Sequence, residues 1–204
     1  MRREMMYNKQ KLSILDAGSG SGVLSAAIVA HLRENGFAGE IELTCYETDS
    51  NVLTLLQTNL KLLEKSYNIT YSLRTDNYIL SQTFRDSSTT ELYDLIIGNP
   101  PYKKIAKNAK EALAIPEVCY GAPNLYFLFW AMAIHNLKTG CEIIYIIPRS
   151  WTSGAYFAKF REYLFSNCVI THLHLFSSRD KVFDGESVLQ ETIIVRSTVH
   201  TTQA

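Results

Sequence analysis

The chain has 204 residues, a length that suits one α/β domain with a buried core and leaves little room for a second. Hydrophobic residues make up 47% of it and charged residues 20%, a globular balance that excludes an intrinsically disordered protein. The formal net charge is zero, so bulk charge gives no sign of a nucleic-acid-binding protein, and any basic surface must be local or belong to a partner.

Cysteine spacing and apolar run lengths exclude several further classes. The four cysteines are far apart and include no C-x-x-C pair, which favours reduced thiols over disulfides or structural zinc. The N-terminus lacks the apolar stretch of a secretion signal. The longest apolar run, residues 125–137, is shorter than the ~20 residues of a membrane span and predicts a buried helix. We expect a cytoplasmic protein with no metal site and no membrane segment.

Short β-rich runs alternate with longer helical runs, a pattern typical of a doubly wound parallel sheet. The predicted order is strand 12–16, helix 22–35, strand 41–46, helix 52–65, strands 69–73 and 93–97, irregular segment 99–123, helix 124–137, strand 142–147, helix 154–165, and strands 169–176 and 187–196. Gly36 is expected to end the first helix and Ser50 to cap the second. No helix separates the last two strands, which predicts an antiparallel hairpin. We therefore expect a Rossmann-like α/β fold, with a seven-stranded, mostly parallel sheet and one antiparallel edge strand.

The first predicted strand ends in a glycine-rich turn, D-A-G-S-G-S-G, that opens a helix. Gly18, Gly20 and Gly22 permit positive φ and close approach of a ligand to the backbone. Their spacing differs from the dinucleotide G-x-G-x-x-G, and no lysine follows, which excludes a P-loop. The Asp16 carboxylate suits the ammonium and sulfonium of S-adenosylmethionine and would repel a pyrophosphate. Asp16, Ala17 and the three glycines are thus candidate cofactor-binding residues, with a dinucleotide as the alternative ligand.

Polar side chains also follow the second and third predicted strands. Glu47 ends the second strand, and its two carboxylate oxygens suit the vicinal hydroxyls of a ribose. Asp49 is the competing candidate, although an acid there fits the N-terminus of the next helix better. Asp76 and Asn77 follow the third strand, where either side chain could accept from the adenine amine of the cofactor. A simple polar turn is the alternative there.

The fourth predicted strand leads into Asn99-Pro100-Pro101-Tyr102. The two prolines fix φ and remove two N–H donors, which leaves bare carbonyls at the strand end. An exocyclic amine on an aromatic base is a poor nucleophile because its lone pair is delocalised into the ring. Acceptance of its N–H groups by the Asn99 side-chain oxygen and the Pro100 carbonyl favours the pyramidal amine that can attack a methyl group. Tyr102 offers a flat face for stacking, so the tetrapeptide predicts methyl transfer to a planar amine.

With these motifs in this order, the chain resembles the gamma-type adenine-N6 DNA methyltransferases of restriction–modification systems over nearly its whole length. Residues 124–129 resemble the helix that packs beside the cofactor, and residues 182–195 resemble the segment that carries a second aromatic wall. The resemblance implies a Rossmann-like class I methyltransferase fold and S-adenosylmethionine as cofactor. It implies catalysis by Asn99, Pro100, Pro101 and Tyr102, with Asn99 also in the cofactor site. Phe183 would stack opposite Tyr102 on an adenine flipped out of double-stranded DNA.

The chain departs from the family pattern at both ends and at one site position. Few residues precede the glycine loop, where the family has another cofactor-contacting segment, and the chain stops where the family continues into a target-recognition domain. Asn77 stands where the family has an acid before the aromatic residue. We expect residues 1–204 to form the S-adenosylmethionine-dependent catalytic domain, with the target-recognition domain or subunit absent from this chain.

Two alternative functions, and the role of one group of lysines, remain open. The same tetrapeptide fits transfer to a protein glutamine or an RNA guanine amine, and truncated ends fit a non-catalytic methyltransferase domain. The segments around Arg149 and Gln190 favour the DNA enzyme. Lysines follow the tetrapeptide at i, i+1, i+4 and i+7, which fits either a phosphate-tracking segment or a solvated helix face. These are Lys103, Lys104, Lys107 and Lys110.

Overall fold

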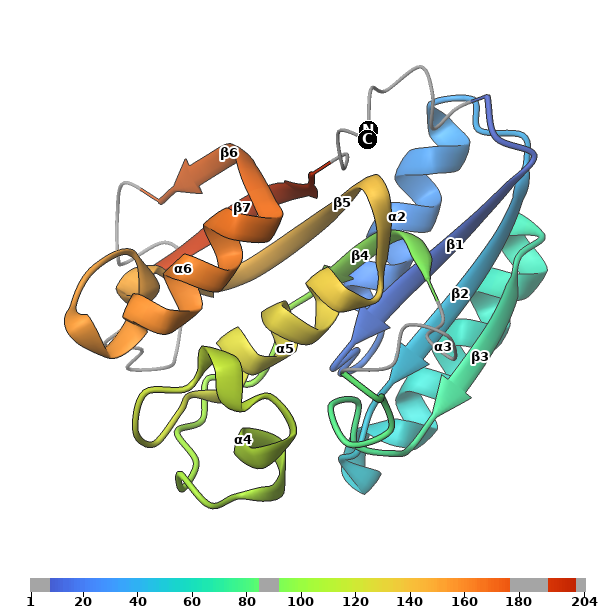
Figure 1. Ribbon diagram of the computed structural model, residues 1–204. Coiled ribbons are helices and arrows are strands. Elements are labelled where there is room, and N and C mark those ends of the chain that lie inside the picture. Colours follow the sequence, from blue (N-terminus) through green and yellow to red (C-terminus); the bar gives the residue numbers. More distant parts are fainter. Residues whose placement is uncertain (1–7, 85–91, 177–190, 201–204) are drawn as a thin grey trace.

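Seven strands form a single sheet in the computed structural model, which describes residues 8–84, 92–176 and 191–200 (Figure 1). The strands are β1 (Lys11–Ala17), β2 (Glu40–Tyr46), β3 (Thr70–Arg74), β4 (Tyr93–Gly98), β5 (Leu137–Pro148), β6 (Cys168–Leu175) and β7 (Thr192–Val199). Their order across the sheet is β3-β2-β1-β4-β5-β7-β6. Because the chain leaves β1 for β2 on one side and later crosses to β4 on the other, the order reverses next to β1. Ligands bind at such a point in open α/β sheets.

The pairing confirms the predicted mostly parallel sheet with an antiparallel hairpin at its edge. Strands β1 to β5 pair in parallel, whereas β7 is antiparallel to both β5 and β6. The structure adds one detail to the prediction. Strand β7 lies between β5 and β6, so the edge strand β6 itself runs parallel to β5.

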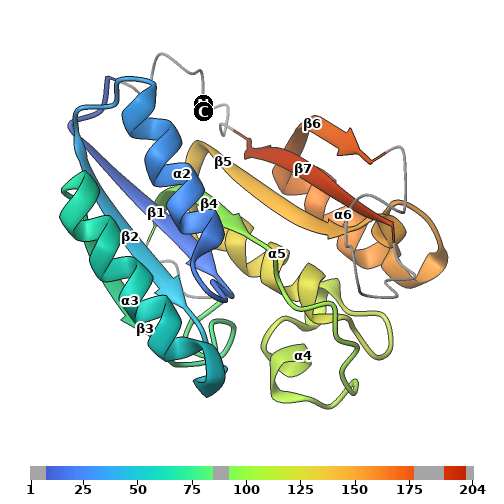
Figure 2. The ribbon, with the colours of Figure 1, turned by 180° about the vertical axis from the view of Figure 1, so that it is seen from behind.

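Helices cover both faces of the sheet. Figure 2 shows α2 (Val23–Glu34) and α3 (Ser50–Tyr67) on one face, and Figure 1 shows α5 (Leu125–His135) and α6 (Ala158–Asn167) on the other. The remaining helical segments are α4 (Lys110–Ala114), η1 (Pro116–Val118), η2 (Arg149–Thr152) and η3 (Ala155–Phe157). Each face of the sheet buries its own apolar cluster against its pair of helices.

Helix α5 is apolar on all sides, and every residue from Tyr126 to Ile134 is buried. A helix of this kind is stable only inside a core, because water would meet an apolar side chain on every face. Asn124 caps it, accepting a hydrogen bond from the Tyr126 backbone N–H at 3.3 Å. The prediction of a buried helix is therefore confirmed. Among the described residues, no helix is long and apolar enough to cross a membrane.

Several predicted boundaries need correction. Asp49, not Ser50, is the N-cap of α3, because its extended backbone lets the carboxylate accept from the Asn51 N–H at 2.9 Å. Helix α6 begins four residues later than predicted, since the chain first forms the short turn η3. Strand β5 begins at Leu137 and runs through Gly140, whose positive φ of 75° accommodates an irregularity within the strand. Gly36 ends α2 as predicted, with φ 87°.

An ion-pair cluster around the buried Asp94 lies at the amino end of β4. The loops that follow β1 and β4 lie at the other end of the strands. The Asp94 side chain is 3% exposed and accepts from Lys9 Nζ and, at 3.0 Å, from Lys138 Nζ. The Ser13 N–H and hydroxyl each donate to it at 2.9 Å. Burial alone would raise the Asp94 pKa, but these donors outweigh it and lower the pKa to about 2.

Candidate active site

The glycine loop and the Asn-Pro-Pro-Tyr tetrapeptide lie side by side, at the carboxyl ends of the neighbouring parallel strands β1 and β4. A Cβ placed on Gly18 would lie 3.9 Å from Pro101 Cδ and 4.0 Å from Pro100 Cα. It would also lie 3.8 Å from the ring of Phe129, on α5. Two motifs about 80 residues apart in the sequence therefore form one site, as a parallel sheet requires.

The glycine loop adopts a backbone that only glycine takes readily. Gly18, Gly20 and Gly22 have φ of 76°, 55° and 84°, in the left-handed region that a Cβ disfavours. The N–H groups of Gly18 and Ser19 both donate to the Tyr46 carbonyl at 2.9 Å, which ties the loop to the end of β2. Helix α2 begins directly after the loop. Its N-terminus, where the partial positive charge of the helix dipole lies, is therefore at this end of the sheet.

Asp16 lies fully buried beneath this loop. The Ser25 hydroxyl donates to Asp16 Oδ2 at 2.6 Å, whereas Asp16 Oδ1 is buried without a hydrogen-bond partner among the described residues. Burial raises the Asp16 pKa to about 6, and the nearby charge of Glu47 adds to the rise, although the bonds from Ser25 oppose it. A buried carboxylate oxygen that lacks a donor fits a cationic ligand group such as an ammonium.

Glu47 stands at the end of β2, half-buried and facing the glycine loop. Its Oε2 accepts from the Gly20 N–H at 2.8 Å, and its Oε1 accepts from the N–H groups of Thr48 and Asp49 at 2.7 and 2.8 Å. Because a carboxylate offers about four lone-pair positions, it retains capacity for a ribose diol. Glu47 is bonded to the glycine loop at Gly20, whereas Asp49 is exposed at the cap of α3, so position favours Glu47 of the two acids.

The turn after β3 distinguishes Asp76 from Asn77. Asn77 Oδ1 accepts from the Ile79 and Leu80 N–H groups at 3.1 and 3.2 Å, and its Nδ2 donates to Glu111 at 2.8 Å. The Asn77 side chain therefore holds the turn together, whereas the Asp76 carboxylate is exposed. This favours Asp76 over Asn77 as the acceptor available to a ligand.

In the tetrapeptide, Asn99 and Pro101 are exposed, Pro100 is buried and Tyr102 is half-buried. The Tyr102 hydroxyl lies within hydrogen-bond distance of two acceptors, Asn99 Oδ1 at 2.5 Å and the Ile146 carbonyl at 3.0 Å. A hydroxyl has one proton, so these acceptors share it. Burial raises the Tyr102 pKa, which keeps the hydroxyl protonated. The Asn99 oxygen is therefore an acceptor already aligned with a donor in the free protein.

Aromatic rings line the same end of the sheet. The Tyr78 ring lies 5.2 Å from that of Tyr46 and 5.4 Å from that of Phe129, between centroids. The Tyr126 ring meets Tyr102 edge-on, with centroids 6.3 Å apart. All of these rings except Tyr102 are buried in the core, so they support the site from the core side.

Sequence reasoning missed Ser25, the Ile146 carbonyl and the Tyr78 ring cluster. A serine within the apolar run V-L-S-A-A-I-V-A was the one signal that could have indicated Ser25. Phe183 and Gln190 lie outside the described residues. The lysines that follow Tyr102 do not share a helix face, because α4 is only five residues long and begins at Lys110. The helix-face interpretation is therefore wrong about the helix, whereas all four side chains are solvent-exposed, as that interpretation expected.

Comparison with known proteins places these motifs in a family. The model of the Eco57I restriction-modification methylases matches residues 7–183. The chain is 37% identical over 198 residues to the type II methyltransferase M.PstI of Providencia stuartii, and 34% identical over 199 residues to M.BsuBI of Bacillus subtilis. Both alignments cover 93% of this chain but 39% and 40% of the relatives. The chain thus spans about two fifths of the length of these curated relatives.

The fold agrees with the sequence match. A Listeria monocytogenes structure assigned to the class I S-adenosylmethionine-dependent methyltransferases superimposes with a TM-score of 0.73 at 18% identity, covering 97% of this chain and 56% of that chain. The described residues therefore have the class I methyltransferase fold. The chain belongs to the Eco57I restriction-modification methylase family.

Proposed function

We propose that this chain holds the catalytic centre that transfers a methyl group from S-adenosylmethionine to the exocyclic amine of adenine in double-stranded DNA, within a restriction–modification system. The observation that carries the proposal is the close approach of the glycine loop at Gly18 to the prolines of the tetrapeptide. A cofactor over the loop and an amine at Asn99 would be neighbours there. The family and the resemblance to adenine-N6 methyltransferases support DNA as the substrate.

The cofactor-binding residues would be Asp16, the loop from Ala17 to Gly22, Glu47 and Asp76, with Asn99 at the reactive end. The unpartnered Oδ1 of Asp16 would accept from a cationic group, and Glu47 would accept from ribose hydroxyls. The exposed Asp76, rather than Asn77, would accept from the adenine amine of the cofactor. When bound, S-adenosylmethionine supplies the electrophilic methyl group.

The tetrapeptide would hold the target amine. Asn99 Oδ1 and the Pro100 carbonyl would accept its two N–H groups, which concentrates the nitrogen lone pair away from the ring. Tyr102 donates to Asn99 Oδ1 in the free protein, so the target amine would replace this hydroxyl and leave it bonded to the Ile146 carbonyl. The ring of Tyr102 would then stack on the base, with Phe183 as the second wall.

Residues 1–204 would act as the catalytic domain, with sequence recognition supplied by a target-recognition domain or subunit outside it. This arrangement is supported by the coverage of the relatives, since the chain spans about two fifths of their length. A base-specific site needs a groove-reading surface, whereas the chemistry requires only that the target base leave the helical stack.

The test measures transfer of labelled methyl from S-adenosylmethionine to duplex DNA, to RNA and to a glutamine-containing protein. We expect label in DNA alone, and we expect Asn99→Ala to abolish transfer while cofactor affinity stays within a few-fold. Label in the protein or RNA would show that the acceptor is another planar amine. An equal loss of transfer and cofactor affinity in Asn99→Ala would show that Asn99 is structural.

A further inference from the structure

Residues 103–124 leave the sheet after Tyr102 and return to the start of α5, and we call this segment the excursion. Its two ends are fastened to each other, because the Ile105 N–H donates to the Pro123 carbonyl and the Leu125 N–H to the Lys103 carbonyl, both at 2.8 Å. Lys104 and Asn124 form a β-bridge at the same place. Figure 1 shows the excursion, with α4, projecting beyond the carboxyl end of β4.

The excursion is a packed platform rather than an extended loop. Ala112, Ile115 and Val118 are buried, and the last two belong to the core that also contains α5. The Cys119 thiol donates to the Ile115 carbonyl at 3.3 Å, which closes a turn within it. Glu111 is bonded to Asn77 at 2.8 Å, which ties the excursion to the turn after β3. Side chains on its outer surface are therefore held at fixed places beside the catalytic site.

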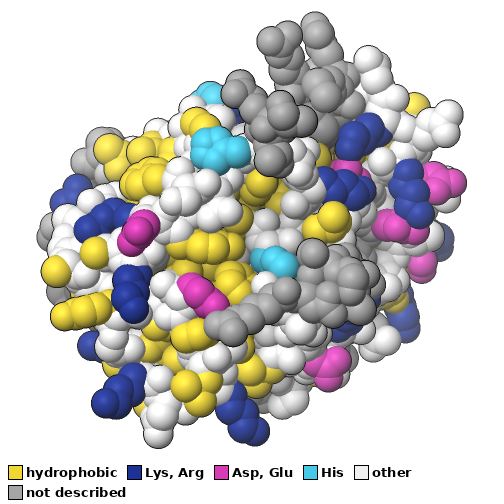
Figure 3. Space-filling model, in the orientation of Figure 1, with side chains coloured by type: hydrophobic (Ala, Val, Ile, Leu, Met, Phe, Trp, Pro, Cys, Tyr) yellow, Lys and Arg dark blue, Asp and Glu magenta, His cyan; other side chains and the backbone are white. Residues whose placement is uncertain are grey.

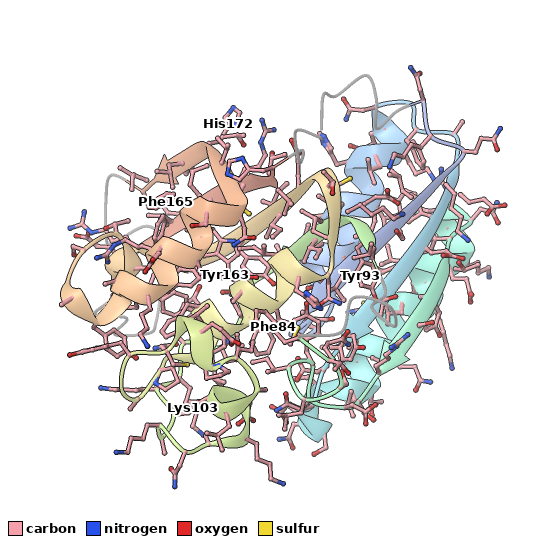
Figure 4. The ribbon with its side chains drawn as sticks, in the orientation of Figure 1. Phe84, Tyr93, Lys103, Tyr163, Phe165 and His172 are labelled. Carbon is pink, nitrogen blue, oxygen red and sulfur yellow. The ribbon has the colours of Figure 1, made fainter. Side chains whose placement is uncertain are left out.

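Its outer surface is basic. The excursion has four lysines, all exposed, against two glutamates, in a chain whose net charge is zero. Of the residues that the structure describes, no carboxylate lies within 4 Å of the amines of Lys103, Lys107 or Lys110. Lys104 lies over the Tyr156 ring at 5.5 Å. Dark-blue side chains along the lower margin of Figure 3 lie over this region, and Figure 4 shows Lys103 on it.

Apolar groups are interleaved with these lysines. Leu113 is 63% exposed and Tyr120 is 60% exposed. Exposed rings and aliphatic groups between unpaired amines are typical of surfaces that bind nucleic acid, since sugars and bases pack on the apolar groups while phosphates meet the amines.

The position of these lysines next to Tyr102 determines which phosphates of a bound DNA strand they can contact. Lys103 is bonded directly to Tyr102, whose ring would hold the target base, so its Cα is ~3.8 Å from that of Tyr102. Each nucleotide carries its phosphate on the same sugar as its base, and the phosphates of one strand recur every ~3.4 Å of helix axis. An amine next to the base platform therefore meets the phosphate of the target nucleotide, and amines further along the excursion meet the phosphates of its neighbours.

We propose that the 103–124 excursion is the surface by which this chain binds the phosphate backbone of duplex DNA on either side of the target adenine. The inference rests on the proposed function and adds to it the place where the catalytic domain itself touches DNA. It also reconciles a neutral chain with a polyanionic substrate, because the positive charge is local rather than spread over the molecule.

The test compares two double variants of equal charge. Lys107→Gln/Lys110→Gln removes two amines from the excursion, and Lys61→Gln/Lys65→Gln removes two exposed amines from α3, on the far face of the sheet (Figure 2). Binding of a fluorescently labelled duplex is measured by anisotropy as a function of salt. We expect the slope of log affinity against log salt to fall by about 2 in the excursion variant and to stay unchanged in the α3 variant.

Three results would overturn the inference. They are equal slopes in the two variants, failure of the unsubstituted chain to bind duplex at low salt, and tighter, lysine-dependent binding of single-stranded RNA. Methyl transfer and cofactor affinity are measured on the same samples. Adenine methylation with unchanged salt slopes would leave the proposed function standing and remove only the excursion as the DNA contact.

Discussion

The buried carboxylate of Asp16 allows a test of the cofactor site that does not depend on turnover. Asp16→Asn keeps the size of the side chain and an oxygen for the Ser25 hydroxyl, but it removes the negative charge. Asp49→Asn is the matched control, because it makes the same acid-to-amide change at an exposed helix cap that asparagine fills equally well.

The sign of the effect on stability follows from the raised pKa. In the folded protein burial raises the pKa of Asp16 from its ordinary value of 3.8 to about 6, so the folded state binds the proton more tightly than the unfolded state. Stability therefore falls as pH rises from about 4 to 6, by at most about 3 kcal/mol. This loss should be absent from Asp16→Asn and present in Asp49→Asn. The comparison of unfolding free energies at pH 4.5 and pH 7.5 measures it.

The same charge should govern cofactor affinity. A charged hydrogen bond contributes about 1.5–3 kcal/mol, so Asp16→Asn should weaken S-adenosylmethionine binding by roughly 10- to 150-fold. In the unsubstituted protein, affinity should fall about tenfold for each pH unit below 6, where Asp16 becomes protonated. Calorimetric titration at several pH values checks both effects. Affinity that is independent of pH and unchanged by Asp16→Asn would refute the assignment of this carboxylate to the cofactor.

Substitutions at three further positions test other parts of the structure. Asp94→Asn should lower the unfolding free energy by about 1–2 kcal/mol at pH 7, with the difference vanishing as pH falls toward the Asp94 pKa of about 2; urea titrations measure it, and a constant difference would contradict the ion-pair argument. Gly22→Ala should cost about 1–2 kcal/mol, because φ is 84° and the new Cβ would lie 2.9 Å from Leu56 Cδ1; an unchanged thermal midpoint would count against it. Tyr102→Phe keeps the ring and frees Asn99, so methyl transfer should stay within a few-fold, whereas Tyr102→Ala should lose about tenfold or more; equal losses would assign the effect to the hydroxyl.

Much of the fold follows from local patterns in the sequence. The apolar strands that precede the glycine loop and the tetrapeptide, and the all-apolar run that becomes α5, were identified with near-correct bounds. Adjacent residues that favour the same role could not be separated, since Asp49 and Ser50 are both good caps and only the backbone decides. The hairpin was evident, but which of its strands lies at the edge depends on pairing across the sheet.

The sequence predicts those parts of the site that short motifs form. It does not predict the hydrogen bonds that site side chains make with distant parts of the chain. Parallel strands bring the Gly18 loop to Pro100, so their contact follows from topology. By contrast, the bond of Tyr102 to the Ile146 carbonyl joins the tetrapeptide to β5, and no local pattern indicates it. The engagement of Asn77 by its own turn likewise emerges only from the folded chain.

The central claim, that Asn99 and Pro100 present the amine of adenine for methylation, has a direct chemical test. Duplex DNA free of methylated bases is incubated with the protein and S-adenosylmethionine that carries a deuterated methyl group, then digested to nucleosides for mass spectrometry. The account predicts labelled N6-methyladenine with the unsubstituted protein and none with Asn99→Ala. Label on cytosine instead, or equal yields of N6-methyladenine from the two proteins, would contradict it.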